Sequence, residues 1–196
     1  MHSKTIPLVV FIVVALGQLY VPASMIIERN DILETGKEFK FKTAPIDPND
    51  PFRGKYVWLN FNDNSVALLD TTVVWNSGET VFAVLVEDSI GMAKVKSIHR
   101  EKPEGTDSYL KTTVRYVSYN PDKVHLEYPF DRFYMEESKA LPAEQAYAKA
   151  SRDDESVAYA LVNIKNGEAV LKDVHIDGVP IREIVKRTME EERNEN

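Results

Sequence analysis

The chain has 196 residues, a formal net charge of −7 and no cysteine. A hydrophobic content of 43% with 28% charged residues is typical of a folded protein that can bury a core. The negative charge argues against nucleic acid and anionic membrane surfaces as main partners. The lack of cysteine excludes disulfides, thiolate catalysis and cysteine-type zinc sites.

An apolar segment at 6–27 follows the short N-terminus at 1–5. Its length matches a bilayer span of about 20 residues. His2 and Lys4 precede the segment, whereas Glu28 and Asp31 follow it, offset only by Arg29. Because positive charge favours the cytoplasmic side, we expect a single-pass transmembrane anchor with the rest of the chain outside the cytoplasm.

The same segment also fits a signal peptide with an apolar h-region at 6–17 and a cut after Ala23. Val21 and Ala23 are acceptable residues for such a cut. The uncleaved anchor is favoured because apolar residues continue past this site as far as Ile27. We expect residues 28–36 to form a short helical stalk.

The body beyond the stalk is predicted to be mostly β (α+β), with antiparallel strands and one or two short helices. Gly36 is the expected stop of the stalk. The run at 80–87 is almost continuously apolar, as in a strand buried on both faces. Strands are predicted at 37–43, 55–61, 80–87, 92–100, 109–117 and 123–128.

Two helices are predicted from composition and periodicity. Residues 141–151 are rich in helix formers, and Pro142 suits a first helical turn. Their narrow apolar stripe consists of Ala143, Ala146, Tyr147 and Ala150. Residues 181–193 have an apolar face and fray into a charged tail. That face consists of Ile181, Ile184, Val185 and Thr188.

Two segments of the body resemble each other. Residues 79–99 and 155–175 align without gaps and share eight of 21 residues. Any two β-hairpins share some valines and a turn glycine, which is the simpler explanation. We nevertheless predict an internal repeat of two related β units at 37–127 and 128–180, followed by a C-terminal helix and tail at 181–196.

The stretch from Pro45 to Phe61 contains three closely spaced prolines, a Pro51–Gly54 turn and an alternating strand. Alternation places one apolar set on the core, namely Val57, Leu59 and Phe61. Tyr56 and Trp58 are then expected on a second, half-covered face. We take this stretch as the candidate interaction motif, with Pro51, Phe52, Arg53, Gly54, Tyr56, Trp58 and Leu59 as its members.

The sequence GKYVWLNF at 54–61 resembles the motif of the GDYXXLXY family of bacterial proteins. Gly54, Tyr56 and Leu59 match the motif, whereas Lys55 replaces its aspartate and Phe61 its final tyrosine. Segments at 132–134 and 169–177 also resemble the family. The resemblance implies a bacterial inner-membrane protein with its body in the periplasm or otherwise extracytoplasmic, and an integral membrane protein as partner. It implies no activity, cofactor or catalytic residue.

The sequence contains no nucleophile elbow, phosphate loop or metal-ligand cluster. The one concrete enzyme alternative is a signal-peptidase-like hydrolase, in which Ser24 at the membrane surface pairs with a buried Lys94 or Lys96. Because its further sequence features are missing, we favour a binding or accessory protein without catalytic residues, cofactor or metal.

Metal binding is the weaker alternative at two places. His99 and His175 are equivalent in the proposed repeat, but strand-end histidines, His125 included, are more often surface residues. Asp47, Asn49 and Asp50 fall short of a calcium loop and suit turns. Aromatic residues near strand ends are expected in the core or in a recognition surface. They are Tyr56, Trp58, Trp75, Tyr116, Tyr119, Phe130, Phe133 and Tyr134.

Overall fold

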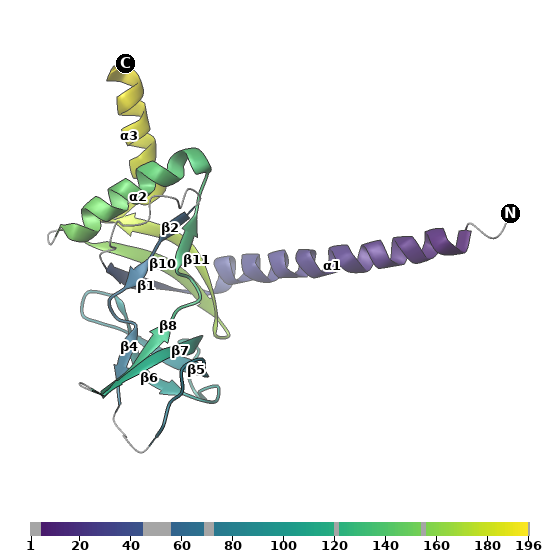
Figure 1. The fold of residues 1–196 in the computed structure, drawn as a ribbon, viewed down its shortest axis with the longest axis horizontal. Helices are drawn as coiled ribbons and strands as arrows, with labels where there is room; N and C mark the ends of the chain where they lie inside the picture. Colours follow the sequence, from purple (N-terminus) through teal and green to yellow (C-terminus); the bar gives the residue numbers. More distant parts are fainter. Residues whose placement is uncertain (1–4, 45–55, 69–72, 120–121, 154–155, 196) are drawn as a thin grey trace.

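The computed structural model describes residues 5–44, 56–68, 73–119, 122–153 and 156–195. Two five-stranded sheets and a two-stranded ribbon form the body, and every strand pair in them is antiparallel. A single long helix, α1 (Thr5–Thr35), projects from the side of this body (Figure 1). The predicted mostly β architecture with short helices is therefore confirmed.

The first sheet has the strand order β12-β11-β10-β1-β3. Helices α2 (Glu137–Arg152) and α3 (Ile181–Glu195) pack beside it at the upper end of the body (Figure 1). Phe39 and Phe41 of β1 are both 2% exposed, as their alternation predicted. The strands are β1 (Lys37–Ala44), β3 (Asn60–Phe61), β10 (Ala158–Lys165), β11 (Glu168–Ile176) and β12 (Val179–Pro180).

The second sheet has the order β4-β8-β7-β5-β6 and forms the lower end of the body (Figure 1). The prediction that residues 80–87 are buried on both faces is wrong. Val81, Ala83 and Leu85 are buried, whereas Val86 is 40% exposed. One face of an antiparallel sheet can remain in water, so this strand alternates. The strands are β4 (Ser65–Ala67), β5 (Thr80–Glu87), β6 (Ala93–His99), β7 (Tyr109–Tyr119) and β8 (Asp122–Glu127).

The strand predicted at 55–61 is divided between two sheets. Its first part, β2 (Tyr56–Trp58), pairs with β9 (Arg132–Tyr134) in the ribbon, and its second part, β3, pairs with β1. At Leu59 the backbone N–H donates to the carbonyl of Asp131, 2.8 Å away. This bond marks the change of partner. The stretch therefore connects the ribbon to the first sheet.

Four aromatic rings meet where the two sheets join. Phe41 of β1 and Phe61 of β3 contact Tyr128 and Phe130, which follow β8. All six pairs of ring centroids are between 5.0 and 6.1 Å apart, and most are edge-on or tilted. The Tyr128 hydroxyl donates to the carbonyl of Asp63 at 2.7 Å. We call these four residues the ring cluster; it packs strands of both sheets against one another.

Helix α2 begins one turn earlier than predicted, and Pro142 consequently lies inside it rather than in its first turn. The N–H groups of Lys139 and Ala140 both donate to the carbonyl of Glu136, which starts the helix ahead of the proline. The predicted apolar stripe is confirmed, since Ala143 and Tyr147 are fully buried.

Helix α3 continues through the segment predicted as a frayed tail and ends at Glu195. Ion pairs one helical turn apart, Glu183 with Arg187 and Lys186 with Glu190, favour this extension. Ile181 and Val185 are fully buried, as predicted for the apolar face.

The two aligned hairpins share one irregularity. Each ladder shifts register where the second strand carries an extra residue, Lys96 in β6 and Lys172 in β11. These lysines are equivalent in the sequence alignment. The outer neighbours differ, because β5 pairs with the later strand β7 and β10 with the earlier strand β1. Strands from the predicted units 37–127 and 128–180 thus share one sheet, and their duplication stays a prediction.

Among the described residues, α1 is the one helix long and apolar enough to span a membrane, and its apolar stretch is not buried against the body. The segments predicted as anchor and stalk form this single helix. Arg29 Nη1 donates to the carbonyl of Ala169 at 2.9 Å. Lys165 Nζ contacts Asp31 Oδ2 at 2.6 Å and Thr35 Oγ1 at 2.8 Å. The end of α1 is therefore attached to the β10–β11 hairpin.

Packing reinforces this attachment. Ile32 is 3% exposed, and Asn163 Nδ2 donates to the carbonyl of Leu33 at 2.8 Å. Gly36 ends the helix, as predicted, and its N–H donates to the carbonyl of Ile32 at 2.9 Å. A β-carbon at this position would lie 2.4 Å from that same oxygen. Only glycine fits here without movement of the backbone. We call this region the helix clamp, defined by Arg29, Asp31, Ile32, Leu33, Thr35, Gly36, Asn163, Lys165 and Ala169.

Replacing Phe41 with alanine should lower the free energy of unfolding by about 3 to 5 kcal/mol, because it removes a ring that contacts the three others. Urea unfolding of the full-length protein in micelles, followed by tryptophan fluorescence, measures this change. Tyr119 is 78% exposed, and its alanine variant should differ from the parent by less than about 0.5 kcal/mol. Equal stabilities for the two variants would contradict the role of the ring cluster.

A second pair of variants tests the helix clamp. Gly36→Ala should speed amide hydrogen exchange at residues 32–36 by about tenfold or more, a loss of about 1.4 kcal/mol of local stability. Gly17→Ala is the matched control, because a β-carbon there meets no atom within 4 Å. Unchanged exchange in the Gly36 variant would show that the junction tolerates the added carbon.

Candidate functional site

The β2–β9 ribbon places four side chains on one face. Its register sets Tyr56 opposite Tyr134 and Trp58 opposite Arg132, with Val57 opposite Phe133 between them. Because side chains alternate along a strand, the central pair points the other way. Val57 and Phe133 are 0% and 3% exposed and belong to the core. The remaining four form what we call the aromatic–arginine ladder: Tyr56, Trp58, Arg132 and Tyr134.

The guanidinium group of Arg132 lies against two rings of the ladder. Its central carbon is 5.4 Å from the Tyr56 ring centroid and 5.0 Å from the Trp58 ring centroid, distances typical of cation–π contacts. The Tyr56 and Tyr134 rings are 5.5 Å apart. A hydrogen bond with Tyr134 and the charge of Asp131 raise the pKa of Arg132, so the guanidinium is charged at any physiological pH.

The ladder is partly open to solvent. Tyr134 is 61% exposed, and Tyr56 and Trp58 are half-buried, as predicted for the second face of the strand. Leu59, another member of the candidate interaction motif, is 1% exposed and supports the ladder from the core. The remaining motif members lie outside the described residues: Pro51, Phe52, Arg53 and Gly54.

Sequence reasoning missed Arg132 as a partner of the motif. The signal was present, because the Pro-Phe pairs at 51–52 and 129–130 stand at nearly equal distances before Tyr56 and Tyr134. The structure pairs these two tyrosines directly. An arginine two residues before Tyr134 then lies opposite Trp58, two residues after Tyr56.

A β-bulge beside the ladder redirects one arginine. Where β7 pairs with β8, Val114 lies opposite Leu126 and Tyr116 opposite His125, so Arg115 is the extra residue. Bulges of this kind re-aim a side chain and are frequent next to binding sites. Arg115 lines the same cleft as Trp58 and Arg132. The structure thus brings together two arginines that the sequence keeps far apart.

His125 lies close to this bulge. Its ring stacks on Tyr116 with centroids 4.2 Å apart and an interplanar angle of 16°. Burial lowers its pKa below the ordinary value of 6.5, and the nearby positive charges of Lys123 and Arg115 lower it further. The neutral ring is therefore the favoured form in the folded protein.

The residues proposed for a hydrolase do not form its arrangement. The Ser24 hydroxyl donates to the carbonyl of Val21 within α1, at 2.8 Å. Lys94 forms an ion pair with Asp88 at 3.4 Å and is 48% exposed, and Lys96 is also exposed. Neither lysine is buried as the hydrolase alternative requires. An exposed ammonium retains its hydration, so burial does not turn either lysine into a general base.

The predicted metal ligands are also dispersed. His99 Nε2 lies 2.9 Å from Ser97 Oγ, and His175 packs against the ring of Tyr159. Within the part of the chain that the structure describes, no three histidine or acidic side chains are grouped to hold a metal ion. The calcium hypothesis rests on Asp47, Asn49 and Asp50, which lie outside the described residues.

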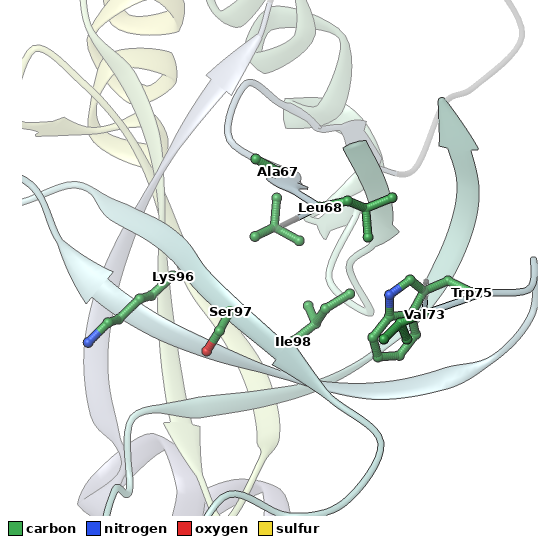
Figure 2. A pocket seen from close by; sticks show the side chains of 8 residues that line it. Ala67, Leu68, Val73, Trp75, Lys96, Ser97 and Ile98 are labelled. Atoms are coloured by element: carbon green, nitrogen blue, oxygen red, sulfur yellow. The ribbon is translucent and has the colours of Figure 1, made fainter. Parts of the chain in front are cut away.

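An apolar cavity of about 200 Å³ lies between β4 and β6 in the second sheet. Figure 2 shows Leu68 on one side of it and Ile98 and Trp75 on the other. The Arg100 guanidinium covers the Trp75 ring at 4.6 Å and pairs with Glu79. This arrangement holds the tryptophan in place. The lining is chiefly aliphatic and presents no convergent set of polar groups.

The pKa of His125 tests whether the positive charge of Arg115 lies close to its ring. Its pKa, measured by NMR titration, should lie below 6.5 and should rise in Arg115→Ala, because one repulsive positive charge is removed. Since the folded-state pKa is lowered, stability should be constant above pH 6.5 and should fall as the pH drops toward the folded-state value. Lys186→Ala, on the exposed side of α3, should leave the pKa unchanged.

Comparison with protein families finds one match. The GDYXXLXY protein family matches residues 18–174, which include the end of α1, the ladder and both sheets. No curated protein and no solved structure is significantly similar to the chain. The match extends over well more than half of the chain and includes the stretch GKYVWLNF at 54–61. The protein is therefore a member of the GDYXXLXY family.

Proposed function

We propose that this protein is a membrane-anchored accessory subunit, with its body outside the cytoplasm, that docks an integral membrane protein. Helix α1 and the aromatic–arginine ladder are the two docking elements. The observation that supports the proposal most is their combination in one rigid arrangement. An exposed apolar helix is clamped to a body that carries a partly exposed, preorganised aromatic surface.

The helix supports the membrane part of the proposal. Phe11, Leu16 and Ile26 are 68%, 62% and 70% exposed in the isolated chain. Each such side chain gains about 1.5 to 3 kcal/mol when it leaves water, so lipid or a partner helix is its favourable environment. A length of 31 residues exceeds the roughly 20 needed to cross the hydrocarbon core. In this proposal the C-terminal turns of α1 extend beyond the hydrocarbon core, and the helix clamp lies at the membrane surface on the extracytoplasmic side.

Charge supports the orientation. Lys4 precedes the apolar segment, and Glu28 and Asp31 follow it closely, offset only by Arg29. Under the positive-inside rule the N-terminus stays in the cytoplasm. For a bacterial member of the family, the body then faces the periplasm from the inner membrane.

The ladder supports a protein partner. Tyrosine, tryptophan and arginine are the residues most enriched at the centres of protein–protein interfaces. Cation–π contacts and the two-stranded ribbon already fix these side chains, so little conformational entropy is lost on binding. The ladder carries a fixed positive charge within an aromatic surface, which fits an extracytoplasmic loop of a membrane protein that presents acidic or carbonyl groups.

Photo-crosslinking in intact bacterial cells tests the proposal. A photoreactive phenylalanine analogue in place of Tyr134 should give one predominant adduct with a multi-span membrane protein, identified by mass spectrometry. The same analogue in place of Tyr119, which is 78% exposed in the second sheet, is the control and should give little adduct. Equal adducts from both positions, or none from position 134, would count against the docking surface.

Compartment and anchorage are checked with the same cells. Protease added to spheroplasts should digest the body and leave a membrane-protected N-terminal fragment. The intact mass of the membrane-extracted chain should include residues 1–23. Loss of those residues would support cleavage after Ala23, and a protease-resistant body would place it in the cytoplasm.

A further inference from the structure

Two clefts beside the ladder adjoin each other and share four lining residues. They have volumes of about 260 Å³ and about 480 Å³. Both are lined by Glu127, Tyr128, Asp131 and Arg132. The combined groove, which we call the polar groove, therefore extends from Trp58 past Arg132 to Gly167.

The end of the polar groove near Trp58 is rich in unpaired polar groups. Asn60, Asn64 and Arg115 line it together with Glu127. Among the described residues, none of these four side chains bonds another protein group, so each can bind a ligand without breaking an internal contact. The β7 bulge places Arg115 there as an extra residue in its strand. β-Bulges that interrupt strand pairing and re-aim a side chain are common next to active sites.

The charges of the polar groove cancel. Its lining contains three basic and three acidic side chains: Lys111, Arg115, Arg132, Glu127, Asp131 and Glu168. A polyanion or a polycation would meet as much repulsion as attraction. An apolar ligand would leave Arg115 and Glu127 desolvated without partners, at a cost of about 1 to 3 kcal/mol each. The ligand that fits is uncharged overall and offers donors and acceptors side by side.

Hydroxyl groups have this property, because each is both a donor and an acceptor. Arginine and asparagine side chains donate to hydroxyl oxygens, and the carboxylates of Glu127 and Asp131 accept from hydroxyl hydrogens. Trp58, with Arg132 stacked 5.0 Å from its ring centroid, adds a flat apolar surface of the kind that packs against the C–H face of a sugar ring. We propose that the polar groove binds an oligosaccharide.

An extended peptide fits less well. Peptides that recognise sheets add a strand to an open edge and bind through main-chain hydrogen bonds. The groove is lined in part by β7 and β8, each of which is already paired on both sides. The edge strands that also line it, β2, β3 and β9, are only two or three residues long and offer little main chain to an added strand. Recognition here must come from side chains, which suits a ligand whose polar groups lie around a ring.

The test uses the full-length protein in a detergent without a sugar head group. The probes are the tetramers of N-acetylglucosamine and of glucose. All measurements use the Trp75→Phe variant, because Trp58 is then the one tryptophan in the chain and the fluorescence comes from it. At least one probe should change the Trp58 emission in a saturable way, with a Kd below about 1 mM.

Matched variants locate the binding. Asn64→Ala and Arg115→Ala should each weaken it about fivefold or more, because each removes a hydrogen-bonding side chain from the polar groove. Tyr119→Ala, at an exposed position outside the groove lining, should leave the affinity unchanged. Far-ultraviolet circular dichroism and urea unfolding confirm that each variant is folded.

Two results would overturn the proposal. The first is that neither tetramer shows saturable binding at concentrations up to about 10 mM, ten times the expected upper limit of the Kd. The second is an equal affinity for the variants and the parent, or a preference for an acidic tetrapeptide over both sugars. The outcome is independent of docking to a membrane protein, since crosslinking at position 134 is measured without added sugar.

Discussion

The ring cluster is the contact on which the rest of the body depends. Phe41 and Phe61 come from the first sheet, Tyr128 and Phe130 from the segment that follows β8 of the second, and every ring contacts the other three. Edge-on and tilted arrangements let each ring meet the positive edge or negative face of its neighbours. Because of this packing, the chain can pass from β2 in the ribbon to β3 in the first sheet at Leu59 while its apolar side chains remain buried. The position of the ladder is set by that transfer, because β2 and β3 are separated by a single residue.

A continuous set of contacts leads from the apolar helix α1 to the ladder. The helix clamp joins α1 to β10 and β11, β10 pairs with β1, and Phe41 of β1 enters the ring cluster. Phe61 carries the contact into the motif strand. The junction at Gly36 has no room for a side chain, so the helix and the sheet form one unit rather than two parts on a flexible linker. A surface carried in this way is held at a defined distance and orientation relative to α1.

The sequence predicted what alternation determines. Phe39 and Phe41, and Val57 and Leu59, are buried because apolar residues at every second position fix a strand's inner face. Alternation could not show that one face of β5 is solvated, since a run such as VFAVLV reads the same in both cases. It could not reveal the Arg115 bulge either, because an extra residue interrupts the pattern itself. The pairing of Trp58 with Arg132 depends on long-range register, which the resemblance between their flanking segments hinted at and composition alone could not fix.

The residues of the family motif have different structural roles. Leu59 is in the core, where packing alone accounts for a leucine. Phe61 replaces the motif's tyrosine inside the ring cluster, where the aromatic ring supplies the contact and the Tyr128 hydroxyl already bonds the nearby Asp63 carbonyl. Tyr56 is different, because it is half-buried on the ladder face and its ring meets Arg132 and Tyr134 rather than the core. Packing of the interior does not demand an aromatic residue there. Recognition of a partner would favour one, and Tyr56 accordingly belongs to the docking surface proposed above.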